Sequence, residues 1–90
     1  MQYLTIALEL LQARPALYAQ VSGRDDWRSE LHRLAVELKS LHLNVLEQLK
    51  QSQPQTSELL LKSQAAEIAI EQFQELLDAQ EQTLIEHKIT

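Results

Sequence analysis

Residues 27–49 read WRSELHRLAVELKSLHLNVLEQL and carry the clearest helical pattern in the chain. Apolar residues recur there in steps of four and three positions, which places them along one stripe of an α-helix. The members of this stripe are Trp27, Leu31, Leu34, Leu38, Leu41, Val45 and Leu49. Such a stripe predicts a long helix that packs lengthwise against neighbouring helices.

Turn-forming residues on both sides predict where this helix begins and ends. Gly23 can close the preceding helix in the left-handed conformation, and Asp25 or Asp26 can accept hydrogen bonds from the free amides of the next. The polar stretch around Pro54 has the length of a link between antiparallel helices. We therefore expect the helix to span about 26–51.

A third helix is expected over about 56–88, with Thr56 or Ser57 as its cap. It carries paired apolar positions around Phe73, which makes its apolar stripe wide. A wide stripe suits the core of a bundle, where one helix faces two others. The alternative is a groove that accepts a foreign helix.

The first helix is expected over about 2–21, with Leu4, Leu8 and Leu11 on one face. Pro15 has no N–H to donate and its ring crowds the preceding turn, so the helix should kink near Arg14. Two shorter helices are the alternative.

These elements predict an all-α fold in one domain over 1–90: an antiparallel bundle of three helices with a long hairpin of the second and third. The chain has 90 residues, 44% of them hydrophobic, with one glycine and no cysteine. This composition favours a folded helical domain and gives no sign of an oxidising compartment. No run reaches the roughly 18 apolar residues of a membrane span, and the N-terminal stretch lacks the basic residues of a signal peptide. We expect a cytoplasmic protein without membrane contact.

The net charge of −5 arises from the last third of the chain, since residues 56–90 contain seven acidic and two basic side chains. Basic residues form no cluster, so nucleic acid is not an expected partner. Four acids follow helical spacing and share one face: Glu67, Glu71, Glu75 and Asp78. This acidic stripe is either a solvated face or a docking strip for a protein partner with a basic surface.

Three further features are candidates for binding a partner. The third helix is longer than the others, so Leu84, Ile85 and Ile89 are expected to overhang, and a second copy of the chain could cover them. Trp27 either plugs the corner between two helices or forms a contact site with Tyr18 and a nearby arginine.

A weaker second stripe in residues 26–51 comprises His32, Val36 and Leu43. It either receives the first helix or contributes to self-association. We expect a homo-oligomer.

Catalytic and metal-binding patterns are missing from the sequence. No histidine has an acidic residue three positions before it, and one glycine cannot form a phosphate-binding loop. We therefore expect no enzyme activity, no metal and no cofactor, and predict a noncatalytic protein–protein interaction module that acts through its acidic surface. The alternative is a small-ligand or cofactor binder with a pocket between helices, lined by Trp27, Tyr18 or His42.

Overall fold

The computed structural model describes the backbone of residues 2–89 and the side chains of residues 2–87. Its helices are α1 (Tyr3–Gln12), α2 (Pro15–Ser22), α3 (Trp27–Ser52) and α4 (Glu58–Ile89). No strand occurs between residues 2 and 89, which confirms the all-α prediction. None of these helices is long and apolar enough to cross a membrane.

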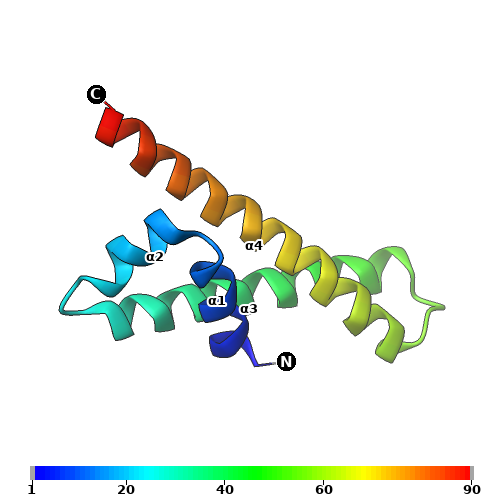
Figure 1. The fold of residues 1–90 in the computed structure, drawn as a ribbon. Coiled ribbons are helices and arrows are strands. Elements are labelled where there is room, and N and C mark those ends of the chain that lie inside the picture. Colours follow the sequence, from blue (N-terminus) through cyan, green and yellow to red (C-terminus); the bar gives the residue numbers. More distant parts are fainter. Residues whose placement is uncertain (1, 90) are drawn as a thin grey trace.

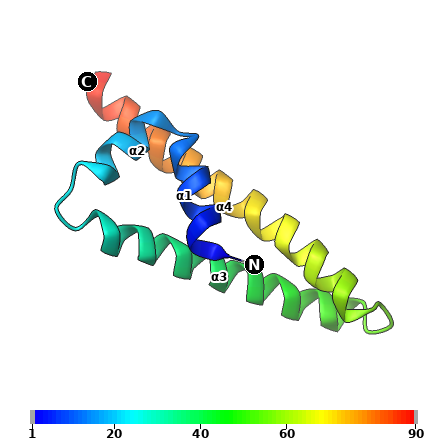
Figure 2. The same ribbon diagram turned by 60° about the horizontal axis from the view of Figure 1, so that its bottom comes forward.

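The two long helices form a hairpin shaped like a narrow V (Figures 1 and 2). α3 and α4 lie together next to the 53–57 link and diverge toward their other ends, where α1 and α2 fill the space between them. α1 packs mainly against α3, whereas α2 packs mainly against α4. The N-terminal segment therefore acts as a wedge that holds the hairpin open.

The expected kinked first helix is two separate helices, as in the alternative. Arg14 has φ −120° and ψ 87°, outside the helical region, because the ring of Pro15 disfavours helical geometry in the preceding residue. Pro15 then takes the first position of α2, where its missing N–H costs no hydrogen bond. The prediction of three helices is therefore wrong, and the proline marks the break.

The core consists of two clusters of buried side chains. The larger one joins α1 and α2 to the diverging halves of the hairpin: Ala7, Leu11, Leu17, Val21, Leu31, Leu34, Ala35, Leu38, Ala69, Phe73 and Leu77. The smaller one lies near the link and comprises Val45, Leu46, Leu61 and Ala65. Most of the α3 stripe is therefore buried as predicted. The centre of the wide α4 stripe forms core, whereas Ile68 and Leu76 at its edges are exposed.

Two of the expected caps are absent and one is present. Gly23 has φ −82° and so does not adopt the left-handed conformation. Asp26 precedes α3 but caps it with no side-chain hydrogen bond, because its carboxylate binds the Arg24 guanidinium instead. Ser57 does cap α4, since its hydroxyl oxygen accepts a hydrogen bond from the Leu60 N–H at 3.3 Å.

Candidate interaction surface

Three members of the acidic stripe lie exposed along α4. Glu67, Glu71 and Glu75 are all solvent-exposed, and none forms an ion pair with any residue in the described part of the chain. Like charges at this spacing repel by a few tenths of a kcal/mol per pair, roughly, so the helix gains nothing by itself from the arrangement. These three residues form what we call the acidic face.

Asp78, the fourth member of the stripe, has a different role. Its Oδ1 accepts a hydrogen bond from the Nε of Arg14 at 2.6 Å. The Arg14 side chain is buried and also donates to the carbonyl of Leu10 at 2.7 Å and to that of Gln74 at 3.4 Å. Asp78 therefore compensates a buried positive charge at the α1–α2 junction, and its carboxylate is not a free member of the docking strip.

Glu81 is a residue that the sequence analysis missed. One oxygen of its carboxylate accepts hydrogen bonds from the backbone N–H groups of Ala16, at 3.0 Å, and Leu17, at 3.2 Å. These are first-turn amides of α2, which has no side-chain cap of its own. A carboxylate from α4 thus stabilises the positive end of α2. The sequence offered one signal for this role: Glu81 lies three positions after Asp78, so the two acids lie on the same side of α4.

Apolar side chains border the acidic face. Leu60 is 51% exposed and Ile68 is 36% exposed. At about 100° of rotation per residue, both lie on the outward side of α4, beside Glu67 and Glu71. The face therefore combines negative charge with apolar area, as protein-binding surfaces commonly do.

The C-terminal apolar residues do not form the expected bare overhang. Leu84 is partly buried because it packs against the larger cluster, and α2 contacts this half of α4. Ile85 is 38% exposed and stays available to a partner. The side chain of Ile89 lies outside the described residues.

Tyr18 and Trp27, the two aromatic residues of the expected contact site, differ in exposure. Tyr18 is partly buried against the larger cluster. Trp27 is 37% exposed, and the Arg28 guanidinium carbon lies 5.3 Å from its ring centroid. Trp27 is therefore not fully buried at the corner between α2 and α3, and its role as a plug stays a prediction.

The second stripe of α3 is open to solvent. Val36 is 62% exposed and Leu43 is 49% exposed, and His32 is exposed as well. α1 does not dock there; it packs on another side of α3, where the Tyr3 hydroxyl lies 3.0 Å from the Nδ1 of His42. The expectation that the first helix covers this stripe is therefore wrong.

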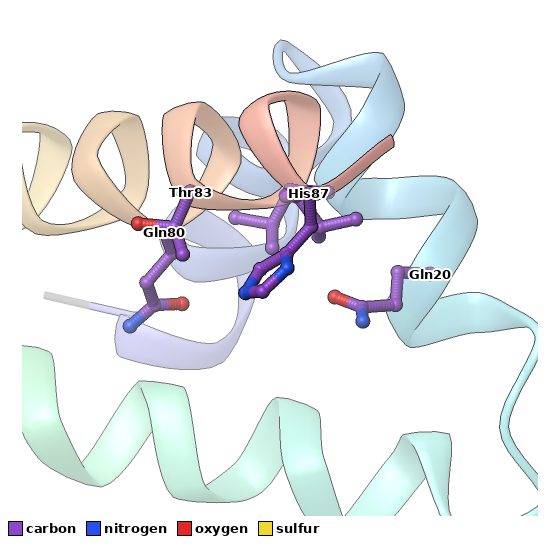
Figure 3. A pocket seen from close by; sticks show the side chains of 6 residues that line it. Gln20, Gln80, Thr83 and His87 are labelled. Carbon is purple, nitrogen blue, oxygen red and sulfur yellow. The ribbon is translucent and has the colours of Figure 1, made fainter. Parts of the chain in front are cut away.

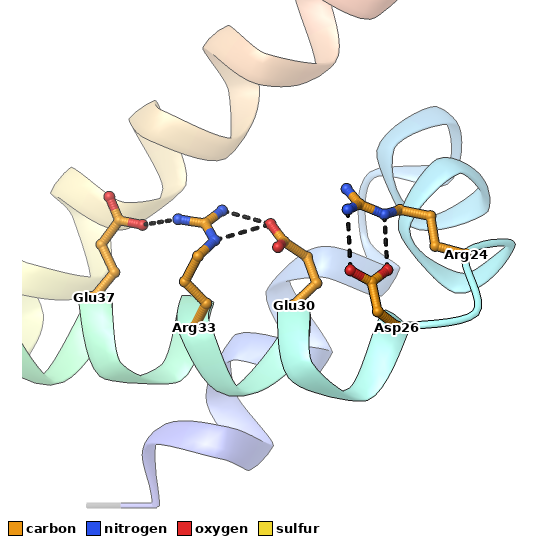
Figure 4. A network of polar contacts seen from close by, with 5 residues as sticks. All are labelled: Arg24, Asp26, Glu30, Arg33 and Glu37. Carbon is orange, nitrogen blue, oxygen red and sulfur yellow. Dashed lines mark hydrogen bonds and ion pairs between the residues drawn. The ribbon is translucent and has the colours of Figure 1, made fainter.

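Surface ion pairs at helical spacing join residues on the first half of α3 (Figure 4). Arg33 donates hydrogen bonds to Glu30 and Glu37, three and four positions away. The hydrogen bonds from Arg33 lower the pKa of the Glu30 carboxyl below its ordinary value of 4.5, although partial burial opposes this effect. Glu30 and Glu37 thus have an ion-pair partner within the chain, unlike the three acids of the acidic face.

A hollow of about 440 Å³ lies between α2 and the C-terminal half of α4 (Figure 3). Its lining consists of Leu17, Gln20, Gln80, Thr83, Leu84 and His87. None of the three residues predicted to line a pocket takes part. Among residues 2–87, no cluster of three or more histidine, aspartate or glutamate side chains could hold a metal ion.

Comparison of the chain with protein-family models, with curated proteins and with solved structures finds no match. We therefore infer the function from the surface of this molecule.

Proposed function

We propose that the protein is a noncatalytic protein–protein interaction module, and that its acidic face binds a partner with a basic surface. The observation that supports this proposal most strongly is the state of Glu67, Glu71 and Glu75, which are exposed and unpaired within the described chain. Glu30 and Asp78, by contrast, have partners inside the molecule, and the other exposed acids without an ion pair in the described chain, such as Glu9, Asp25 and Glu47, do not share one helical face.

A basic partner would relieve the repulsion among these three carboxylates. Complementary charge also raises the rate of association, and this effect weakens as salt screens the charges. Because α4 is anchored within this segment by the core side chains of Ala69 and Phe73, the carboxylates are presented on a rigid element. Binding therefore needs little ordering of this face.

The test compares two triple variants that remove equal charge. Glu67→Gln, Glu71→Gln and Glu75→Gln together remove the acidic face, whereas Glu9→Gln, Asp25→Asn and Glu47→Gln remove three exposed acids elsewhere. A partner is first recovered by pull-down with the wild-type chain and identified, and its Kd is then measured by calorimetry. We expect the first variant to weaken binding by about tenfold or more and the second to leave it within about twofold. Equal effects of the two variants would contradict the proposal.

A second candidate function is the binding of a small ligand in the hollow between α2 and α4. Its support is the mixture of an apolar wall, Leu17 and Leu84, with amide groups from Gln20 and Gln80. A screen of small molecules by ligand-observed NMR tests it. Hits that lose binding in a Leu84→Trp variant, which fills the hollow, would support the candidate, and hits unaffected by that variant would exclude it.

A further inference from the structure

The outer face of α3 carries positive charge and apolar side chains. Its members are spaced by four, four, three and four positions, so they share one stripe on the side of α3 away from the core: Arg28, His32, Val36, Lys39 and Leu43. All five are exposed. Lys39 has no ion pair in the described part of the chain. We call this stripe the basic face.

The acidic face and the basic face match in length and order when two helices run antiparallel. Arg28 to Leu43 spans fifteen positions, and so does Leu60 to Glu75, which is about 22 Å of helix in each case. In that register Arg28 lies opposite Glu75, and His32 lies opposite Glu71. One apolar pair also meets, since Leu43 lies opposite Leu60, whereas Val36 lies opposite Glu67, the residue before Ile68.

The remaining cation also finds an acid in this register. Lys39 lies opposite Gln64, one helical turn from Glu67, and the lysine side chain is long enough to reach the carboxylate. Each unpaired acid of α4 thus faces or neighbours a basic side chain of α3. The four apolar residues between the charges are 36–62% exposed in the single chain and would be covered together.

We infer that the partner of the acidic face is a second copy of this chain, which docks its basic face on it with α3 antiparallel to α4. The inference rests on the proposed function and specifies the partner of that same face. The two faces belong to different helices, so the contact is head to tail. Each copy has both the basic face, on α3, and the acidic face, on α4. Charge complementarity, together with the apolar pair of Leu43 and Leu60, distinguishes this occupant from an arbitrary basic protein.

Two charge-reversal variants test the inference. The α3 variant carries Arg28→Glu and Lys39→Glu, and the α4 variant carries Glu71→Lys and Glu75→Lys. All four side chains are exposed, so both variants should keep the helical circular dichroism of the wild type. A control variant changes charge by the same amount as the α3 variant at exposed glutamines away from the two faces: Gln12→Glu, Gln48→Glu, Gln51→Glu and Gln55→Glu.

Sedimentation velocity gives the result for each variant alone and for mixtures. We expect the wild type to self-associate more as its concentration rises, and the control variant to self-associate to the same extent. Each reversal variant alone should associate about tenfold more weakly or not at all, and an equimolar mixture of the two should recover association, because each supplies the face that the other has lost. Raising salt from about 50 to about 500 mM should weaken all of these contacts.

Three outcomes would overturn the inference: a wild type that stays monomeric up to about 1 mM, an α3 variant that associates as the wild type does, or a mixture that recovers nothing. The proposed function is judged separately. Suppose that the wild type stays monomeric but binds a different basic protein, and that the triple variant of Glu67, Glu71 and Glu75 binds this protein more weakly. The proposed function then stands, and only the identity of the partner is wrong.

Discussion

The two ends of the α3/α4 hairpin are held together in different ways. Near the link the helices touch directly through four buried residues, and the cross-helix ion pair there, Lys50 with Glu58 at 3.5 Å, is exposed. At the other end the helices diverge, and α1 and α2 enter with a larger cluster and the buried Arg14. The short helices α1 and α2 add apolar side chains to the core. They also bury helix ends, and the polar groups at those ends, including backbone N–H groups and the Arg14 guanidinium, need hydrogen-bond partners. Asp78 and Glu81 supply them.

The largest expected effect is on the core of the wide end. Phe73 is fully buried, so Phe73→Ala should lower the free energy of unfolding by about 3–5 kcal/mol. Leu61→Ala, in the smaller cluster near the link, should cost about 2 kcal/mol, because fewer side chains surround the cavity that it leaves. Urea denaturation followed by circular dichroism measures both. A larger loss at Leu61 would mean that the link end dominates stability.

The Arg14–Asp78 pair should respond asymmetrically to substitution. Asp78→Ala leaves the Arg14 guanidinium buried without its carboxylate and should cost about 2–3 kcal/mol. Arg14→Met keeps the packing and leaves Asp78, whose side chain is 65% exposed, free to be hydrated, so it should cost about 1 kcal/mol. The double variant should be more stable than Asp78→Ala alone. If instead Arg14→Met is the more harmful change, burial of the guanidinium is not the controlling factor.

A smaller effect is expected at the α2 cap. Glu81→Ala removes the acceptor for the Ala16 and Leu17 amides and should cost about 1 kcal/mol, as the loss of other caps does. Hydrogen exchange of these two amides should accelerate more than that of α3 amides. The matched control is Gln82→Ala, whose side chain is exposed and bonds only to Glu86 on the same helix. Equal exchange in the two variants would show that α2 does not need the carboxylate.

The smallest effect concerns the surface pair on α3. Hydrogen bonding by Arg33 lowers the pKa of Glu30, so the ionised form stabilises the folded state, and Glu30→Gln should cost about 0.5 kcal/mol near neutral pH. This advantage of the wild type is complete above the ordinary pKa of 4.5 and disappears as the pH falls through the lowered folded value. Urea midpoints of both proteins at about pH 7 and about pH 3 measure the difference. A difference that persists at the acidic pH would have another cause.

Much of the fold could be predicted from periodicity, because each long helix buries a stripe that the sequence displays. Leu31, Leu34 and Leu38 are buried as their spacing required. The sequence showed that Pro15 interrupts the first helix. It could not show whether the helix kinks or ends there, because that depends on the side chains that pack against each of the two arrangements. The wedge itself could not be predicted, since the angle between α3 and α4 depends on what fills the space between them.

The site was less predictable than the fold. Helical spacing placed Glu67, Glu71, Glu75 and Asp78 on one face, and the first three are indeed exposed together. Spacing could not show that Asp78 has a partner 64 positions earlier in the chain. The predicted cap at Asp26 is missing for a related reason, because the Asp26 carboxylate binds the Arg24 guanidinium instead.

The long reach of the Arg14 and Glu81 contacts has a consequence for biosynthesis. The hydrogen bonds of these residues join positions 60 to 65 apart in sequence. A ribosome releases the N-terminal end first, yet α2, which packs mainly against α4, must wait until residues 74–81 have been translated before its binding site exists. The two long helices, which are neighbours in sequence, can pair earlier. Of the helices described, α2 is thus made before the hairpin but locks into place after it.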